Sequence, residues 1–194
     1  RQADLDGNPY YKRTVPPLTY SEGAVSIRRR HRGDLEMDLS GRDEEHIGWL
    51  WQPSEADQWK EMTPTERRAH ALEWLAGVSD SFGNGPRWTF SVDIAEATSI
   101  AAVDVNLTSD HAPPGEANIS YWVHPTFRRR GIAPVAVQLA LQFLRDHTST
   151  RRAHIMVDPN NSPSLAVAAS LGATVGAMTV DRHGRSLRRH SLEL

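Results

Sequence analysis

The sequence predicts a single α/β domain in which a mixed sheet is flanked by helices, and three observations support this. The length of 194 residues suits one domain with a sizeable core. Hydrophobic residues make up 39% of the chain and charged residues 24%, which is the balance of a soluble globular protein. Between residues 118 and 172 the apolar pattern alternates between strand and helix periods, which is typical of strand-helix-strand units.

The N-terminal half divides into an arm and the start of the domain. Residues 1–23 show neither helical nor strand periodicity, so we expect an extended N-terminal arm before a domain at 24–194. Thr63-Pro64-Thr65-Glu66 combines a cap residue, a proline at the first helical position and a glutamate at the third, which predicts a helix start. The other elements expected here are strands at 24–30 and 35–39, a helix from Asp43 to Trp51, a loop at Pro53, and strands at 88–94 and 99–107.

The C-terminal half predicts two successive strand-turn-helix units and a final hairpin. The expected elements are a strand at 118–123, a helix at 132–147, a strand at 153–157, a short helix ending near Leu171-Gly172, and a hairpin around His183-Gly184. A crossover of this length normally joins parallel strands, so the first two strands should lie side by side. Both turns then open at the same end of the sheet, where open α/β sheets bind their ligands.

The first of these turns, Arg128 to Pro134, joins a strand to a helix N-terminus. Backbone N–H groups at such a terminus lack partners and lie at the positive end of the helix dipole, so they favour an anion. Gly131 lets the backbone approach a phosphate closely because it has no Cβ. The arginines add positive charge around a diphosphate. Composition alone favours an ordinary surface turn, so the flanking sequence decides between the two interpretations.

The pattern Arg-x-x-Gly-x-Ala, at Arg128 to Ala133, resembles the coenzyme A pyrophosphate loop of the GNAT superfamily of N-acetyltransferases. The preceding segment, Ile119 to Pro125, is similar to the strand before this loop in the branch that contains the ribosomal-protein N-terminal acetyltransferases. Asn161 to Ser164, followed by Leu171 to Ala173, resembles the Asn-x-x-Ser and Leu-Gly-Phe signature of that branch. The resemblance extends more loosely from about Leu35 to the C-terminus.

This resemblance implies a GNAT-like domain with a central mixed, mostly antiparallel sheet of about seven strands and a splayed parallel pair at its centre. It implies acetyl-CoA as the cosubstrate, with the pantetheine arm along Trp122, Val123 and His124. The Asn161 amide would bond the pantetheine, and the Ser164 hydroxyl would lie near the sulfur. The residues expected around the pyrophosphate are Arg128, Arg129, Arg130, Gly131, Ile132 and Ala133. The second turn is also compatible with a plain helix cap, for which Ser162 before Pro163 is a natural residue.

Acyl transfer to an amine requires a base, an oxyanion donor and a proton donor for the departing thiolate. A backbone N–H near Val123 or His124 would serve the oxyanion. Many superfamily members place a tyrosine acid in the last helix, where this chain has Ala168, so Ser164 is the residue expected to polarise the thiolate. Glu116 is the expected base. Its alternatives are Asp104, His111 and His124, since Asn118 stands where the branch tends to carry a glutamate.

The expected acceptor is a primary amine, either a small molecule or a protein or peptide N-terminus, which attacks directly in a ternary complex. Four tryptophans fall where this fold forms its acceptor-side helices, and they either line an amine pocket or pack in the core. They are Trp49, Trp51, Trp59 and Trp74. The acidic residues nearby suit a cationic acceptor and equally a solvated surface. They are Asp43, Glu44, Glu45, Glu55 and Asp57.

Composition weighs against several other classes of protein. The formal net charge of -2 disfavours a nucleic-acid binder, despite arginine-rich runs at 28–32 and 128–130. The apolar runs are too short for a membrane span and the first residues lack a signal-peptide pattern, so we expect no membrane partner and a cytoplasmic location. With no cysteine and no zinc-like spacing among nine histidines, no metal is expected. We expect a monomer or homodimer. The alternative to an enzyme is a non-catalytic acyl-CoA-binding sensor module.

Overall fold

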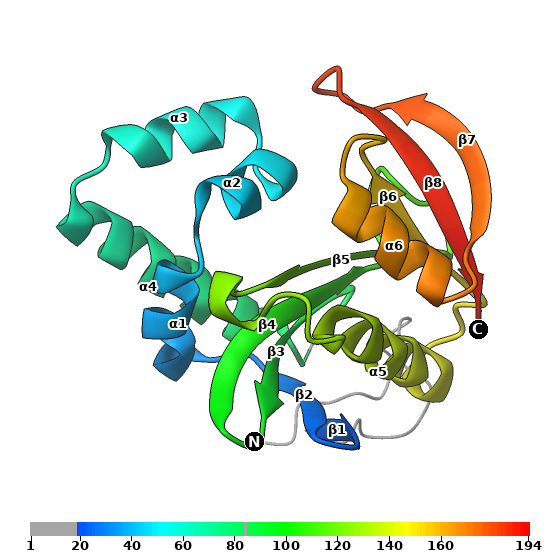
Figure 1. Ribbon diagram of the computed structural model, residues 1–194, viewed down its shortest axis with the longest axis horizontal. Helices are drawn as coiled ribbons and strands as arrows, with labels where there is room; N and C mark the ends of the chain where they lie inside the picture. The colour runs from blue at the N-terminus through cyan, green and yellow to red at the C-terminus, as the bar shows by residue number, and fades with distance from the viewer. Residues whose placement is uncertain (1–18, 84) are drawn as a thin grey trace.

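The computed structural model describes residues 19–83 and 85–194, which form an eight-stranded sheet with helices on both faces (Figure 1). The strand order across the sheet is β1-β2-β3-β4-β5-β6-β8-β7. The strands are β1 (Thr19–Glu22), β2 (Val25–Arg29), β3 (Arg87–Ile94), β4 (Ala97–Asn106), β5 (Ala117–Val123), β6 (Arg152–Val157), β7 (Thr174–Val180) and β8 (Ser186–Glu193). The helices are η1 (Arg32–Asp34), α1 (Leu35–Ser40), α2 (Glu44–Leu50), α3 (Pro53–Glu61), α4 (Pro64–Ser81), η2 (Pro125–Phe127), α5 (Ile132–His147) and α6 (Ser162–Ser170).

Strands β1 to β5 form an antiparallel meander, and the alternation of side chains gives this part of the sheet an apolar and a polar face. On the apolar face, Trp88 and Phe90 of β3 pack against Phe143 of α5, with ring centroids 5.3 and 5.1 Å apart. Helices α1 and α4 contact β4 and β3, and Figure 1 shows α1 to α4 grouped on one side of the sheet, away from α5. None of the described helices is long and apolar enough to cross a membrane.

Most of the expected elements are confirmed. Helix α5 has the predicted bounds, and its stripe of Val137, Ala140, Leu141 and Leu144 is buried against the sheet. Helix α4 begins at the predicted cap, where the Glu66 amide donates to Thr63 and the Glu66 carboxylate accepts from the Thr63 amide at 2.7 Å. The capping box and the apolar stripe are both local sequence patterns, so each of these helices can be predicted from its own residues.

Two expectations for the N-terminal half are wrong. The segment 35–39, expected as a strand, is helix α1, and Pro53 begins helix α3 instead of lying in a loop. Leu35 and Leu39 are four residues apart, so they share a helix face and join Leu75 of α4 in a small apolar cluster. The alternation at 35–39 therefore fits a helix as well as a strand, and packing on α4 decides between them.

Part of the segment expected as an extended arm belongs to the sheet. Thr19–Glu22 form β1, which pairs with β2 in the order Thr19↔Arg28 to Glu22↔Val25. Tyr20 is buried and its hydroxyl contacts His147 at the end of α5. Four residues are too few to show a recognisable strand period, so the sequence alone does not reveal β1. The remainder of the expected arm, 1–18, lies outside the described residues.

The predicted parallel pair is confirmed at the centre of the sheet. Strands β5 and β6 pair only at Ala117↔Ala153 and Asn118↔His154. Beyond these positions β5 continues to Val123 without a partner strand on that side, while β6 pairs with β8 along its whole length on its other edge. The sheet is therefore mixed and mostly antiparallel, as expected, with eight strands and a central opening.

Candidate active site

The open edge of β5 is the first component of the site. Its residues pair alternately with β4, and the His124 amide donates to the Ile100 carbonyl at 2.8 Å. Hydrogen-bonded and non-bonded residues alternate in an antiparallel ladder, so the main-chain groups of Tyr121 and Val123 face away from β4. They point into the opening between β5 and β6. Of the segment Trp122 to His124 that the sequence indicated, only Val123 therefore presents its amide to a ligand in the opening.

The turn after β5 is the second component. Arg129 and Gly131 both have left-handed backbones, with φ values of 63° and 71°. This conformation favours glycine, and a Cβ at Gly131 would be strained although space is open around it. Gly131 is the N-cap of α5 and supplies no side chain to the first helical turn. No hydrogen bond to the amides of Ile132 or Ala133 is found among the described residues, as is usual in the first turn of a helix.

The three arginines of this turn differ in what they contact. Arg128 is already paired within the protein, donating to Asp43 at 2.8 Å, to Glu45 at 2.6 Å and to the Val123 carbonyl at 3.1 Å. It ties the turn to the start of α2. Arg130 lies 3.7 Å from Glu96 and is half exposed. Arg129 lines the cavity described below.

Helix α6 brings the third component. Its N-cap is Asn161, whose side-chain oxygen accepts from the Ser164 amide at 3.1 Å, so the cap is not Ser162. The Ser164 hydroxyl lies 2.7 Å from the hydroxyl of Tyr121 on β5. Burial raises the pKa of Tyr121 to about 12, although the hydrogen bond with Ser164 opposes this rise. At neutral pH the phenol is therefore protonated and can donate.

Sequence reasoning missed Tyr121 as a functional residue. The position in the last helix where many superfamily members carry a tyrosine holds Ala168, which is fully buried. A phenol instead reaches Ser164 from the strand. The alternation of β5 could have indicated Tyr121, because Ile119, Tyr121 and Val123 share the face that packs on α5, next to α6.

A cavity of about 1420 Å³ joins these components. On the cofactor side it is lined by residues from β5, the turn and α6, including Val123, Arg129, Gly131, Asn161 and Ser164. On the other side it is lined by α1 to α4 and the polar face of the sheet, including all four tryptophans named above. The tryptophan-lined part and the cofactor side thus belong to one continuous space.

The structure does not bring Glu116 to this cavity. Its carboxylate pairs with His154 of β6 and lies 3.4 Å from Arg152, at the start of β5 and away from the opening. Among the alternatives, Asp104 and His111 line the cavity, whereas His124 bonds Thr126 at 2.9 Å and Ser40 at 3.2 Å.

Asp104 lies on the floor of the cavity, opposite Ser120 of β5. Its Oδ1 accepts from Arg87 at 2.8 Å and from Thr89 at 2.6 Å. Asn118 is on the same face, and its side-chain oxygen is buried without a hydrogen-bond partner among the described residues. These polar groups form a row beneath the space where an acceptor would lie.

A splayed parallel pair, a glycine turn at a helix N-terminus and a hydroxyl beside the opening define a class of acyl-transferring enzyme. The chain belongs to the GNAT acetyltransferase family, because the family model described as an acetyltransferase (GNAT) domain matches residues 26–174. This confirms the family that the motifs predicted. No curated protein matches the chain in sequence.

Several solved structures share the fold. The RimJ structure from Mycobacterium smegmatis in complex with CoA-disulfide has a TM-score of 0.70 at 19% identity, covering 87% of this chain and 81% of that chain. RimL, a ribosomal L7/L12 alpha-N-protein acetyltransferase in complex with coenzyme A, has a TM-score of 0.68 at 15% identity, covering 93% and 98%. The microcin C7 self-immunity acetyltransferase MccE, in complex with acetyl-CoA and AMP, has a TM-score of 0.69 at 16% identity, covering 89% and 94%.

Proposed function

We propose that the protein transfers the acetyl group of acetyl-CoA to a primary amine by direct attack in a ternary complex. The observation that carries this proposal is that one continuous cavity extends from the open edge of β5 and the N-terminus of α5 to the tryptophan-lined space under α1 to α4. Both substrates therefore fit at once, with the thioester at the junction. Solved structures of the same fold hold coenzyme A or acetyl-CoA, which supports this choice of donor.

The cofactor is held mainly by main-chain groups. The pyrophosphate binds the amides from Arg129 to Ala133, where the helix dipole and the left-handed residues favour an anion. The pantetheine runs beside β5 and bonds the main chain at Tyr121 as an added strand would, whereas the Val123 carbonyl accepts from Arg128 and the Val123 amide is left for the thioester. The Asn161 side chain keeps its amide NH₂ for the same arm, since its oxygen caps α6.

The tetrahedral intermediate places negative charge on the former thioester oxygen. The Val123 amide points into the opening and is already fixed by the β4–β5 ladder, so it donates to this oxygen without rearrangement. Removing one such donor typically costs ~10²- to 10³-fold in turnover. The His124 amide does not compete for this role, because it bonds Ile100.

Collapse of the intermediate breaks the carbon–sulfur bond and leaves a thiolate. Ser164 donates its hydroxyl proton to this sulfur and takes one from Tyr121, with which it is in direct contact, and the phenolate is reprotonated from water in the cavity. Burial keeps the phenol protonated at neutral pH before the sulfur departs, although it also makes the phenol a weaker acid. Serine and tyrosine together thus replace the single tyrosine acid expected from the family.

The attacking amine must lose a proton on the opposite side of the reaction. Asp104 is the carboxylate on the cavity floor, so we assign it as the base, directly or through water. Glu116 loses this role in the proposal, since His154 and Arg152 hold its carboxylate away from the cavity.

A thiol-release assay tests the proposal, with acetyl-CoA as donor and panels of small amines and N-terminal peptides as acceptors. Ser164→Ala should lower turnover by ~10²-fold and Tyr121→Phe by ~10-fold, because water replaces a lost proton relay only in part. Ser162→Ala, exposed on the same helix and outside the cavity, is the matched control and should keep full activity. Tight coenzyme A binding with no turnover on either panel would instead identify a non-catalytic binding module.

A further inference from the structure

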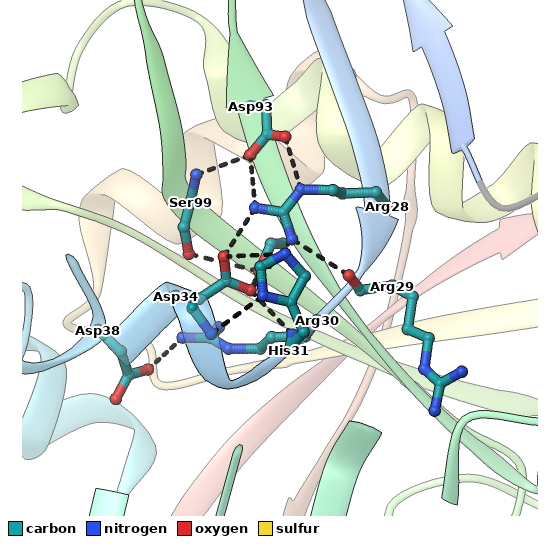
Figure 2. A network of polar contacts seen from close by, with 10 residues as sticks. Arg28, Arg29, Arg30, His31, Asp34, Asp38, Asp93 and Ser99 are labelled. Carbon is teal, nitrogen blue, oxygen red and sulfur yellow. Dashed lines mark hydrogen bonds and ion pairs between the residues drawn. The ribbon is translucent and has the colours of Figure 1, made fainter. Parts of the chain in front are cut away.

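The tryptophan-lined part of the cavity is built around buried charges that lie just after β2, on α1 and between α1 and α2. Asp38 accepts from Arg30 and, at 2.8 Å, from Nε of Arg42. The side chains of Arg30, Arg42 and Asp38 are 0%, 4% and 3% exposed. Figure 2 shows Arg30 reaching Asp38, beside a separate group in which Arg28 binds both Asp34 and Asp93. The carboxylates are therefore concentrated around Arg28, and the positive charge exceeds the negative charge at the Arg42 end.

Several donors at this end have no partner. Nη1 of Arg42, Nε and Nη1 of Arg30, and Nδ1 of His46 are buried without a hydrogen bond among the described residues. Leaving a buried polar group unsatisfied costs ~1–3 kcal/mol, so folded proteins rarely retain such groups without a functional reason. Arg42 and His46 both line the cavity. A ligand in the cavity can supply the missing acceptor atoms.

Aromatic rings restrict how such a ligand approaches. The guanidinium carbon of Arg42 lies 4.7 Å from the Trp59 ring centre, 5.2 Å from that of Trp51 and 6.0 Å from that of Trp74. Rings near the faces of a guanidinium leave its edge for hydrogen bonds, and this edge matches the paired oxygens of a carboxylate or phosphate. Nη1 of Arg42 is buried in this structure, so a neighbouring ring has to move before a ligand can bind it. Trp51 is partly exposed at the end of α2, whereas Trp59 is buried, so Trp51 is the ring with room to move.

The carboxylates around this part of the cavity are already used by the protein. Asp38 serves two arginines, Glu45 pairs with Arg128, and Glu55 accepts from the Gln52 amide at the start of α3. Of the other acidic residues that suggested a cationic acceptor, Asp43 also pairs with Arg128, Asp57 lies 3.4 Å from Lys60 on the surface, and Glu44 is exposed and does not line the cavity. The cationic part of an acceptor would be repelled by Arg42, and Asp38, the carboxylate beside Arg42, is already paired with two arginines.

We propose that the acceptor carries an anionic group, a carboxylate or a phosphate, in addition to its primary amine, and that this group binds Arg42 beside His46. The inference rests on the proposed function, because it places the two ends of one acceptor molecule at the two ends of the cavity. The amine reaches the thioester near Val123, and the anionic oxygens occupy the edge of the Arg42 guanidinium. His46 is neutral, since burial lowers its pKa to about 4, and its Nδ1 has no hydrogen-bond partner among the described residues.

Matched pairs of acceptors test this inference in the thiol-release assay. Phenylalanine against phenylalaninamide isolates the carboxylate, and phosphoethanolamine against ethanolamine isolates the phosphate. Spermidine represents the cationic class. In at least one pair the anionic member should have a kcat/KM at least ~10-fold higher, the scale of one charge-assisted hydrogen bond. A preference for spermidine or for the neutral members would overturn the inference while leaving acetyl transfer itself intact.

Variants test whether Arg42 is responsible for the preference for anionic acceptors. Arg42→Gln should bring the ratio of anionic to neutral kcat/KM towards one, and Arg42→Lys should retain part of it because the charge remains. Arg67→Gln is the matched control, since Arg67 also lies over Trp59, at 5.2 Å, but bonds the carbonyls of Trp59 and Lys60 outside the cavity. An unchanged ratio in Arg42→Gln would refute the assignment.

A binding measurement decides the matter even if no amine on the panel is acetylated. Inorganic phosphate and benzoate are titrated into the full chain saturated with coenzyme A, so that the pyrophosphate site is already filled. Either ion should change the tryptophan fluorescence as Trp51 moves, and Arg42→Gln should abolish that change. Denaturation curves show whether Arg42→Gln is folded, and Arg42→Lys, which keeps the charge beside Asp38 but loses the paired N–H groups, replaces it if it is not and should weaken the response. Phosphate and benzoate responses that survive in the folded variant would overturn the inference.

Discussion

Replacing Asp34 tests the polar network that supports the acceptor side of the sheet. Asp34 is buried at the end of η1 and accepts from Arg28 at 2.7 and 3.1 Å, from the His31 amide at 3.0 Å and from the Ser91 hydroxyl at 2.7 Å. Figure 2 shows Arg28 and His31 converging on this carboxylate. Asp34→Asn keeps the size of the side chain but removes the charge that all of them bind.

The expected loss in the free energy of unfolding is about 3 kcal/mol. Breaking a buried ion pair by removing one partner costs ~3–5 kcal/mol. The lower end applies here, because Arg28 is 19% exposed and keeps Asp93 as a second partner at 2.7 Å. A loss of this size is a large part of the stability of an ordinary domain.

The loss should also depend on pH. Burial alone would raise the pKa of Asp34, but hydrogen bonds from Arg28, His31 and Ser91 outweigh it and hold the pKa below its ordinary value of 3.8. A carboxyl with a lowered native pKa stabilises the fold above its unfolded pKa and loses this effect as the pH falls through its native pKa. The difference between the native protein and Asp34→Asn should therefore be constant near neutral pH and shrink below about pH 4.

Urea denaturation followed by tryptophan fluorescence, repeated from pH 7 to pH 3, measures both quantities. Asp57→Asn is the matched control, because its pair with Lys60 is exposed and is expected to contribute less than ~1 kcal/mol. A loss below ~1 kcal/mol for Asp34→Asn, or a difference that grows on acidification, would contradict the reasoning.

Three further predictions concern other parts of the molecule. Glu116→Gln should leave kcat unchanged at neutral pH in the thiol-release assay, because the carboxylate serves His154 and Arg152; a large fall in kcat would return Glu116 to the mechanism. Gly41→Ala places a Cβ 2.5 Å from the Trp122 ring, so the ring must shift, and we expect a higher KM for the acceptor with unchanged calorimetric affinity for coenzyme A. Leu75→Ala empties a fully buried site in the cluster between α1 and α4 and should cost ~2–3 kcal/mol in urea denaturation, whereas Leu72→Ala, on the same helix and 37% exposed, should change stability by less than ~1 kcal/mol.

Local signals account for the parts of the fold that the sequence predicted well. The bounds of α5 follow from a glycine turn and a continuous apolar stripe, and the start of α4 follows from a capping box. The segment 35–39 failed because its alternation is too short to exclude a helix, and its state depends on packing against Leu75, some forty residues away in the chain. Helix α3 was missed although Pro53 and Glu55 mark its start.

The candidate site likewise contains residues that local sequence could place and residues that depend on the packing of distant elements. Residues of the turn and of α6 were placed by motif, because the chain positions them locally. Glu116 was chosen for sharing a strand face with Asn118, yet alternation indicates a face and not a position along the strand. Its ion pair with His154 depends on the register of β6, and the contact between Tyr121 and Ser164 depends on how α6 packs. Neither is visible in one sequence.

Strand β5 separates the two halves of the proposed reaction. Side chains at 118, 120 and 122 face the acceptor space under α1 to α4, whereas Tyr121 faces the side of α5 and α6. The Val123 amide lies between them, in the plane of the sheet. An amine attacking from the first side therefore expels a thiolate towards Ser164 and Tyr121 on the other, and base and acid do not compete for one proton. It follows that substitutions at Trp122 should change chiefly the KM of the acceptor, while those at Asp104, Tyr121 and Ser164 should change chiefly kcat.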